Sequence, residues 1–303
     1  MANTIQTTEL ANHIPTIVAA EALGYLRANT VMANLVARDW DDEVAQAGQV
    51  VKIPFRGALT ANNKAEGSIV TKQTPSDTAV TVTLNKHKEV TFIIEDVAKA
   101  FARPEVLMGY MRDGMAVIAE AVDGDLTGLY SGLSQTIDAS GGAGPLDLAD
   151  FREAQRLLNA AKAPMGDRVA VLHEDAYFEA TNIAQLIHRD YQGDEAMTAI
   201  KAGYLGSLSG FRIFMDQKIA VATAVCKNLF FNRNAFVLAS RPLPSAPVEW
   251  GVAQAVMAED GLGLRVTMSY DTDYLGAKCT IDFLYGVAEL RDAFGVTVST
   301  TEK

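Results

Sequence analysis

The chain has 303 residues, of which 49% are hydrophobic and 21% are charged, and its formal net charge is −11. This composition is typical of a globular protein with a sizeable core and excludes wholesale disorder. The acidic balance argues against tight nucleic-acid binding, which depends on basic groups that displace counterions from phosphates. No stretch approaches 18 consecutive apolar residues and the first residues do not resemble a secretory signal, so we expect no membrane association.

The first hundred residues predict an arm, a helix and three strands. Residues 1–13 are polar and lack periodicity, whereas apolar residues follow helical spacing over 17–26. Apolar and polar residues then alternate over 51–55, 80–84 and 90–94, and this period of two is typical of strands.

A connection of 23 residues, 56–78, separates the first two predicted strands. Loops of this length are uncommon in compact domains and are usually functional or disordered. If the connection is an extended hairpin, roughly 12 residues per side at about 3.4 Å each reach on the order of 40 Å. An isolated two-stranded hairpin is marginally stable in water, so such an arm should lie on another molecule. A floppy loop is the alternative. The expected tip is at Asn62, Asn63 and Lys64.

A long helix and a flexible junction follow. From Leu107 to Leu133 apolar residues recur every three or four positions, which predicts one amphipathic helix over 104–134, roughly 45 Å long. The sequence SGGAGP at 140–145 is the clearest hinge, because glycine and proline interrupt regular structure most strongly. We therefore expect a second domain to begin there.

The second half predicts a mixture of helices and strands. Asp147 and Asp150 suit a helix N-terminus, and the apolar face that follows extends this helix to about 161. A proline-rich segment at 241–247 then leads into further alternating strands. The predicted strands are at 169–172, 211–215, 229–231, 235–239, 264–270 and 279–283.

The sequence contains no pattern that indicates catalysis or a cofactor. Its four histidines lack metal-ligand spacing, and its two cysteines, Cys226 and Cys279, are 53 positions apart. The segment GSLSG at 206–210 has leucine where a nucleophile elbow requires serine. No catalytic residue, metal ligand or cofactor is predicted, although a carboxylate pair that forms only in space leaves no trace in sequence.

The order of these elements resembles the major capsid (coat) proteins of tailed bacteriophages, which have the Hong Kong 97-like fold, and specifically the podovirus coat type. Each segment is weakly specific, and the ordered set carries the resemblance across almost the whole chain. The segments are VMANLVARDW at 31–40 leading to GQVVKIP at 48–54, FIIEDV at 92–97 followed by AEAVDGDL at 119–126, GYLGSLSGFRI at 203–213, and YGV at 285–287.

The resemblance implies an α+β fold with named parts. These are an N-terminal arm and helix (1–35), a peripheral domain (36–145) with an extended loop (50–85) and a spine helix (104–134), an axial domain (146–240), and a return to peripheral-domain strands (241–303). The loop residues expected to contact a neighbouring subunit are Arg56, Asn62, Asn63, Lys64, Glu66 and Lys72. The expected hinge residues are Gly141, Gly142 and Gly144.

The implied function is structural: hexamers and pentamers of the chain form an icosahedral shell that encloses double-stranded DNA in the virion capsid. A net charge of −11 per copy suits a container that does not grip its DNA. Implied partners are a portal protein and a separate scaffolding protein, and assembly takes place in the bacterial cytoplasm. Two alternatives stay open: an encapsulin-like nanocompartment that encloses a cargo enzyme, and an acidic soluble enzyme.

Overall fold

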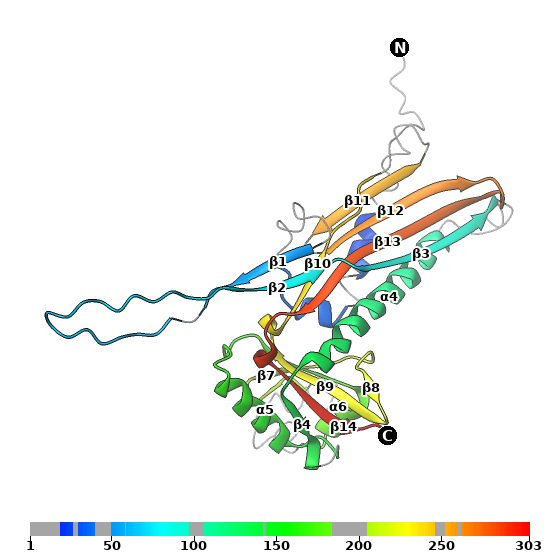
Figure 1. Ribbon diagram of the computed structural model, residues 1–303. Helices are drawn as coiled ribbons and strands as arrows, with labels where there is room; N and C mark the ends of the chain where they lie inside the picture. Colours follow the sequence, from blue (N-terminus) through cyan, green and yellow to red (C-terminus); the bar gives the residue numbers. More distant parts are fainter. Residues whose placement is uncertain are drawn as a thin grey trace.

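The computed structural model describes residues 19–26, 30–39, 50–57, 59–96, 106–141, 144–183, 205–245, 252–259 and 262–303. Helices and strands are mixed, as predicted, in two large sheets joined by one long helix, with a two-stranded sheet from which a narrow arm projects (Figure 1). The helix predicted at 17–26 is confirmed over 19–26, and the predicted arm at 1–13 lies outside the described residues. Within the described ranges no helix has both the length and the hydropathy needed to cross a membrane.

An antiparallel sheet of five strands forms the elongated part of the molecule (Figure 1). Its alternating residues separate two faces, as predicted. Leu264 pairs with Phe283 on the buried face, whereas Arg265 and Asp282 form an ion pair on the opposite face. The strands are β3 (Lys86–Glu95), β10 (Phe236–Ser240), β11 (Ala253–Glu259), β12 (Leu262–Asp271) and β13 (Gly276–Glu289).

The helix α4 (Val106–Thr127) packs against β3 and β13. It continues as the 3-10 helix η2 (Gly128–Gly132), so the predicted long helix is confirmed with a tightened last turn. Its side chains at helical spacing are buried, and the opposite face exposes Tyr110 and Val117. The buried series is Met111, Met115, Ile118, Val122 and Leu126.

A seven-stranded mixed sheet forms the other part of the molecule, with α5 (Leu148–Ala160) and α6 (Glu174–Ala180) packed near it (Figure 1). Asp147 and Asp150 form a capping box at the start of α5, which confirms the predicted helix start. In the core, Phe230 meets Phe151 and Phe211 edge to face, at ring-centroid distances of 5.0 and 5.3 Å. The strands are β4 (Thr136–Asp138), β5 (Arg168–Leu172), β6 (Ser207–Leu208), β7 (Phe211–Met215), β8 (Val221–Ala222), β9 (Val225–Asn232) and β14 (Gly295–Thr301).

The sheets divide the chain differently from the boundaries expected at 146–240 and 241–303. β10 was assigned to the axial segment but pairs with β13 in the five-stranded sheet. β14, expected to return to the first-half strands, pairs with β9 and β4 in the seven-stranded sheet. Local patterns fix a strand and its buried face but not its neighbour, so they did not predict these pairings. One continuous apolar core extends from α4 into both sheets.

The predicted hinge contains a compact turn. The 3-10 turn η3 (Ala139–Gly141) ends at Gly141, and the amide of Gly144 donates a hydrogen bond to the carbonyl of Ala139 at 2.7 Å. A Cβ on residue 144 would lie 2.7 Å from the Cβ of Ser140, so this close approach requires glycine. Gly142 lies outside the described residues, and hinge motion at this turn stays a prediction.

Candidate assembly arm and its anchorage

The arm begins as a two-stranded ribbon of β1 (Val50–Phe55) and β2 (Thr78–Thr83). These strands pair antiparallel, from Val50 opposite Thr83 to Phe55 opposite Thr78. Beyond the ribbon, the connection leaves the body as two extended limbs that run beside each other (Figure 1). The extended-hairpin interpretation is therefore correct in outline, although in the described part of 56–77 no strand pairing continues past Phe55 and Thr78.

Side chains join the two limbs in place of a backbone ladder. The Gln73 amide bonds to the backbone and hydroxyl of Thr60, with Thr60 N donating to Gln73 Oε1 at 2.8 Å. Nearer the body, Gly57 N donates to Asp77 Oδ1 at 3.1 Å. At the far end Gly67 has a φ of 78°, which favours glycine and closes the turn. The two limbs thus hold a defined course although solvent surrounds them.

We call the part of the connection beyond the ribbon, residues 56–77, the arm, and β1 with β2 its base. The six loop residues predicted to contact a neighbour are all exposed on the arm. The turn is at Glu66 and Gly67, so placing the tip at Asn62, Asn63 and Lys64 was wrong by a few residues. Polar composition alone does not locate a turn, whereas the left-handed conformation at Gly67 does. Whether these residues contact another subunit stays a prediction.

Sequence reasoning missed the apolar side chains of the arm. Leu59, Ile69 and Val70 are 68%, 90% and 59% exposed, although the surrounding residues are polar. A solitary exposed aliphatic residue is ordinary, whereas three on one projecting element leave an unusual amount of apolar surface in water. The sequence did contain a signal for this surface: three large aliphatic residues lie in a polar connection that is long enough to extend away from the core of the subunit.

A small separate core anchors the base of the arm. Val51 and Ile53 of β1 and Val82 of β2 pack with residues of β10 and β13. The guanidinium of Arg291 lies over the ring of Phe55 at 5.0 Å, where the ribbon leaves the body. The base is thus fixed to the five-stranded sheet, while the limbs beyond Phe55 contact solvent.

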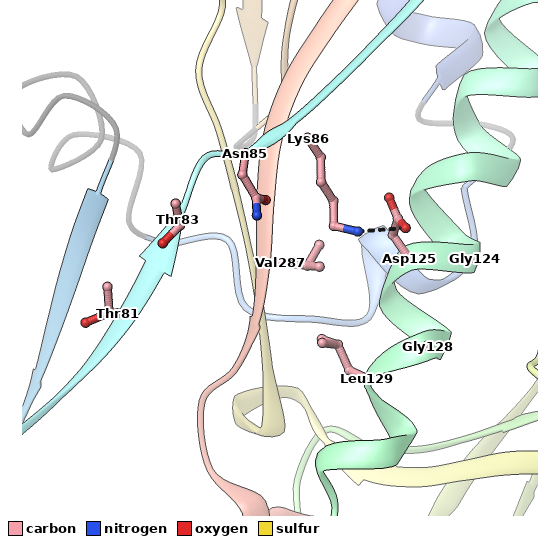
Figure 2. Close-up of a pocket in the computed structure, with 9 residues that line it drawn as sticks. All are labelled: Thr81, Thr83, Asn85, Lys86, Gly124, Asp125, Gly128, Leu129 and Val287. Atoms are coloured by element: carbon pink, nitrogen blue, oxygen red, sulfur yellow. Dashed lines mark ion pairs between the residues drawn. The ribbon is translucent and has the colours of Figure 1, made fainter.

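A polar pocket of about 440 Å³ lies between this base and α4 (Figure 2). Lys86 Nζ pairs with Asp125 Oδ1 at 2.8 Å, and the hydroxyl of Tyr285 donates to Asp125 Oδ2 at 2.6 Å. Burial raises the pKa of Asp125, but hydrogen bonds from Lys86 and Tyr285 and the nearby lysine charges outweigh it, so the pKa lies below its usual range. Asp125 on α4 therefore binds Lys86 at the start of β3 with one oxygen and Tyr285 of β13 with the other.

A second open hollow, about 630 Å³, lies on the polar face of the five-stranded sheet. Asp282 there accepts hydrogen bonds from Arg265 at 2.9 and 3.0 Å and lies 3.1 Å from His87 Nε2. The Asp282 side chain is buried and that of Arg265 is partly exposed, and this ion pair joins the neighbouring strands β12 and β13. Neither this hollow nor the pocket beside α4 contains a nucleophile paired with a base.

A buried carboxylate fixes the segment that precedes the arm to α4. Asp123 Oδ2 accepts from Val31 N at 2.7 Å, and Asp123 Oδ1 accepts from Ala33 N at 3.3 Å. These donors open the 3-10 helix η1 (Met32–Asn34). Burial, with the nearby Asp216 carboxylate adding to it, raises the pKa of Asp123 to about 7, despite the backbone hydrogen bonds that favour the charged form.

This carboxylate predicts a pH-dependent stability of the unassembled subunit. Because the folded state holds a proton on Asp123 more tightly than the unfolded chain does, the free energy of unfolding should fall as pH rises from about 4 to about 7. Asp123→Asn should remove up to about 4 kcal/mol of that pH dependence. Urea unfolding at pH 4 and pH 8 measures it, with Asp113→Asn, an exposed site on the same helix, as the control. An unchanged slope in Asp123→Asn would contradict the assignment.

Comparison with known proteins finds similarity of structure. Neither a family model nor a curated protein matches the sequence. A structure of Mycobacterium phage Che8 aligns with a TM-score of 0.66 and 23% identity, covering 89% of this chain and 90% of that chain. The capsid structure of cyanophage P-SCSP1u aligns at 0.64 with 14% identity, covering 90% and 89%. A virus-like particle from Pyrococcus furiosus aligns at 0.51 with 10% identity, covering 93% and 97%.

Each of the two phage alignments covers about nine tenths of this chain and of the other chain. The α+β capsid architecture expected from the order of elements is therefore confirmed. The chain has the fold of tailed-bacteriophage capsid proteins.

Proposed function

We propose that the chain is the major capsid protein of a tailed bacteriophage and assembles into an icosahedral shell around double-stranded DNA. The observation that carries this proposal is the arm: a projecting element with a fixed base and three exposed aliphatic side chains. Within the part of the chain that the structure describes, Leu59, Ile69 and Val70 stay largely uncovered. The capsid fold, shared over most of the chain, supports the view that another copy provides that surface.

Apolar burial provides a driving force of suitable size. Fully burying one aliphatic side chain contributes roughly 1.5–3 kcal/mol, so covering the three residues on one arm contributes several kcal/mol. In a closed shell each copy gives one arm and receives another, so the shell contains one such contact for every subunit. Many weak contacts of this kind make assembly cooperative while an isolated pair of subunits binds weakly.

Charge also favours contact between the arm and another copy. The arm contains three basic and two acidic residues, whereas the remainder of the chain carries a net charge of −12. Arg56, Lys64 and Lys72 would therefore approach an acidic neighbour favourably, an effect that salt weakens. We infer that the six predicted loop residues and the three aliphatic residues together form the contact surface.

The rest of the proposed particle follows the same reasoning. Hexamers and pentamers of the chain form the virion capsid, and a portal protein occupies one opening for DNA. The five-stranded sheet with α4 corresponds to the peripheral domain and spine helix, and the seven-stranded sheet to the axial domain. DNA is enclosed without tight binding because each copy is strongly acidic. This function is structural, not enzymatic, and assembly takes place in the bacterial cytoplasm.

A nanocompartment is the second candidate, since the P. furiosus virus-like particle aligns over nearly its whole chain. Its TM-score of 0.51 is lower than the 0.66 and 0.64 of the two phage structures, which favours the virus. The two functions differ in contents. Particles that contain a bound enzyme, and no DNA-packaging genes beside the capsid gene, would favour the nanocompartment.

Negative-stain electron microscopy with size-exclusion chromatography tests the proposal. We expect closed shells tens of nanometres across when the chain is produced with the adjacent scaffolding gene. The purified chain alone should give monomers or irregular aggregates, because the proposed scaffold is a separate protein. Uniform shells from the chain alone would contradict a separate scaffold. A compact monomer under every condition, scaffold included, would contradict the capsid function.

A further inference from the structure

Three side chains of different metal-ligand type meet at one end of the seven-stranded sheet. His173 directly follows β5, Asp175 lies in the first turn of α6, and Cys226 lies on β9. One nitrogen, oxygen and sulfur atom from these residues lie within 4.8 Å of one another, and His173 Nδ1 is 3.5 Å from Asp175 Oδ2. The proposed shell function uses none of them.

The surrounding framework holds these residues in place. β5 and β9 are antiparallel neighbours, with Val171 opposite Leu229. The buried side chain of Asn228 accepts from the His173 amide at 2.8 Å and donates to Thr300 Oγ1 at 2.8 Å, which links β5, β9 and β14. Cys226 lies two residues before Asn228 on the same strand and therefore on the same face. Ligand positions supported in this way by secondary structure are preorganised.

The three groups have the chemistry of a zinc site. His173 and Cys226 are buried, and His173 Nδ1 is the unprotonated ring nitrogen, because it accepts a hydrogen bond from Asp175 N at 3.4 Å; zinc binding at this nitrogen would replace that bond. Zinc binds nitrogen, sulfur and carboxylate oxygen at about 2.0–2.3 Å in tetrahedral geometry, which places ligand atoms about 3.3–3.8 Å apart. The spacing of His173 and Asp175 already fits, and the Cys226 sulfur has to approach by up to about 1 Å.

The charges around the cluster favour a cation. Asp175, Glu302 and Glu179 place negative charges near Cys226. The same field attracts a divalent cation, which would displace the thiol proton and bind the thiolate. Lys303 offsets part of the field, because its Nζ lies 2.8 Å from Glu179 Oε1.

We propose that His173, Asp175 and Cys226 bind one zinc ion, with water in the fourth position. The ion would join the start of α6 to β9. Because β9 pairs with β14, the bound zinc would also stabilise the strand that completes this sheet. Each zinc bound displaces one proton from Cys226 as the metal–sulfur bond forms.

Metal content of the untagged, full-length subunit tests this site. The chain is purified in chelator, incubated with zinc sulfate, desalted and analysed for zinc. We expect about one zinc per chain, and at least a tenfold weaker affinity in Cys226→Ala and in His173→Asn. Asparagine is a good N-cap, so His173→Asn preserves the helix start that His173 now caps. Cys279→Ala is the matched control, since Cys279 is the other buried cysteine and lies on β13.

The absorption spectrum of the cobalt-bound chain provides a second measurement, which distinguishes loss of the sulfur ligand from a folding defect. Cobalt bound through Cys226 should show thiolate-to-metal charge-transfer absorption that Cys226→Ala loses and Cys279→Ala retains. Circular dichroism of each variant without metal establishes that it is folded. Wild-type chain that holds no zinc, or Cys226→Ala that binds zinc as tightly as wild type, would overturn the proposal. Neither result depends on whether the subunit forms shells.

Discussion

Deletion of residues 61–71 is expected to leave a folded, soluble subunit that forms no closed shells. The deletion removes the turn together with Ile69 and Val70, while β1 and β2 keep their packing against the five-stranded sheet. The removed residues are exposed and contribute little to the stability of the subunit. Circular dichroism and urea unfolding should therefore match wild type, whereas chromatography and electron microscopy with scaffold present should show only unassembled protein.

A point variant separates the contribution of apolar contact from that of arm length. Ile69→Asp with Val70→Asp keeps the arm complete but places two charges where burial is expected, so it should also abolish assembly. The matched control is Thr71→Asp with Thr74→Asp, which adds the same charge at neighbouring exposed positions without removing aliphatic groups. We expect the control to retain shells, with some weakening at low salt. Normal shells from the 61–71 deletion would refute the proposed role of the arm.

Gly286→Ala is expected to dislodge the base of the arm. At this position β2 crosses β13 so closely that a Cβ would overlap the Thr83 carbonyl and lie 2.8 Å from its carbon atom. The obstacle is backbone, which no rotamer change can move. Overpacking costs typically 1–3 kcal/mol, and we expect a loss near the upper end, about 3 kcal/mol, in the free energy of unfolding. Hydrogen exchange should also accelerate in β2.

Gly124→Ala is the control for that experiment. A Cβ on Gly124, in α4, would meet no atom within 4 Å, so alanine should stabilise the subunit by about 1 kcal/mol through its helix propensity. The two variants make the same chemical change with opposite expected signs. If Gly286→Ala unfolds at the same urea concentration as wild type, then the close crossing of β2 and β13 is not the anchor described above.

Local patterns predicted much of the fold. Apolar residues at helical spacing located α4, and alternation located β1, β2 and β3, because side-chain period reports directly on which face is buried. The arm was predicted from the length and polarity of residues 56–78, and its extended course was correct in outline. The position of its turn, at Gly67, was not predicted, because several polar positions could have closed the loop equally well.

The resemblance to phage coat proteins rested on the order of elements, and the structural alignments confirm the fold it implied. The candidate contact surface was predicted only in part. Six polar residues were named from the loop, but the exposure of Leu59, Ile69 and Val70 emerged from the three-dimensional arrangement. Aliphatic residues in a sequence are ordinarily assigned to a core, and only the course of the chain shows that no core lies within reach.

The sequence by itself determined the long helix, the strands and the presence of an arm, since each depends on neighbours within a few residues. Only the tertiary structure decided which strands pair and which distant side chains meet. It placed β10 and β14 in sheets other than those expected, because strand pairing depends on register across distant segments. It also brought Cys226 to His173 and Asp175, which are about fifty positions away in the chain. Long-range contacts of this kind leave no local period, so only the folded chain reveals them.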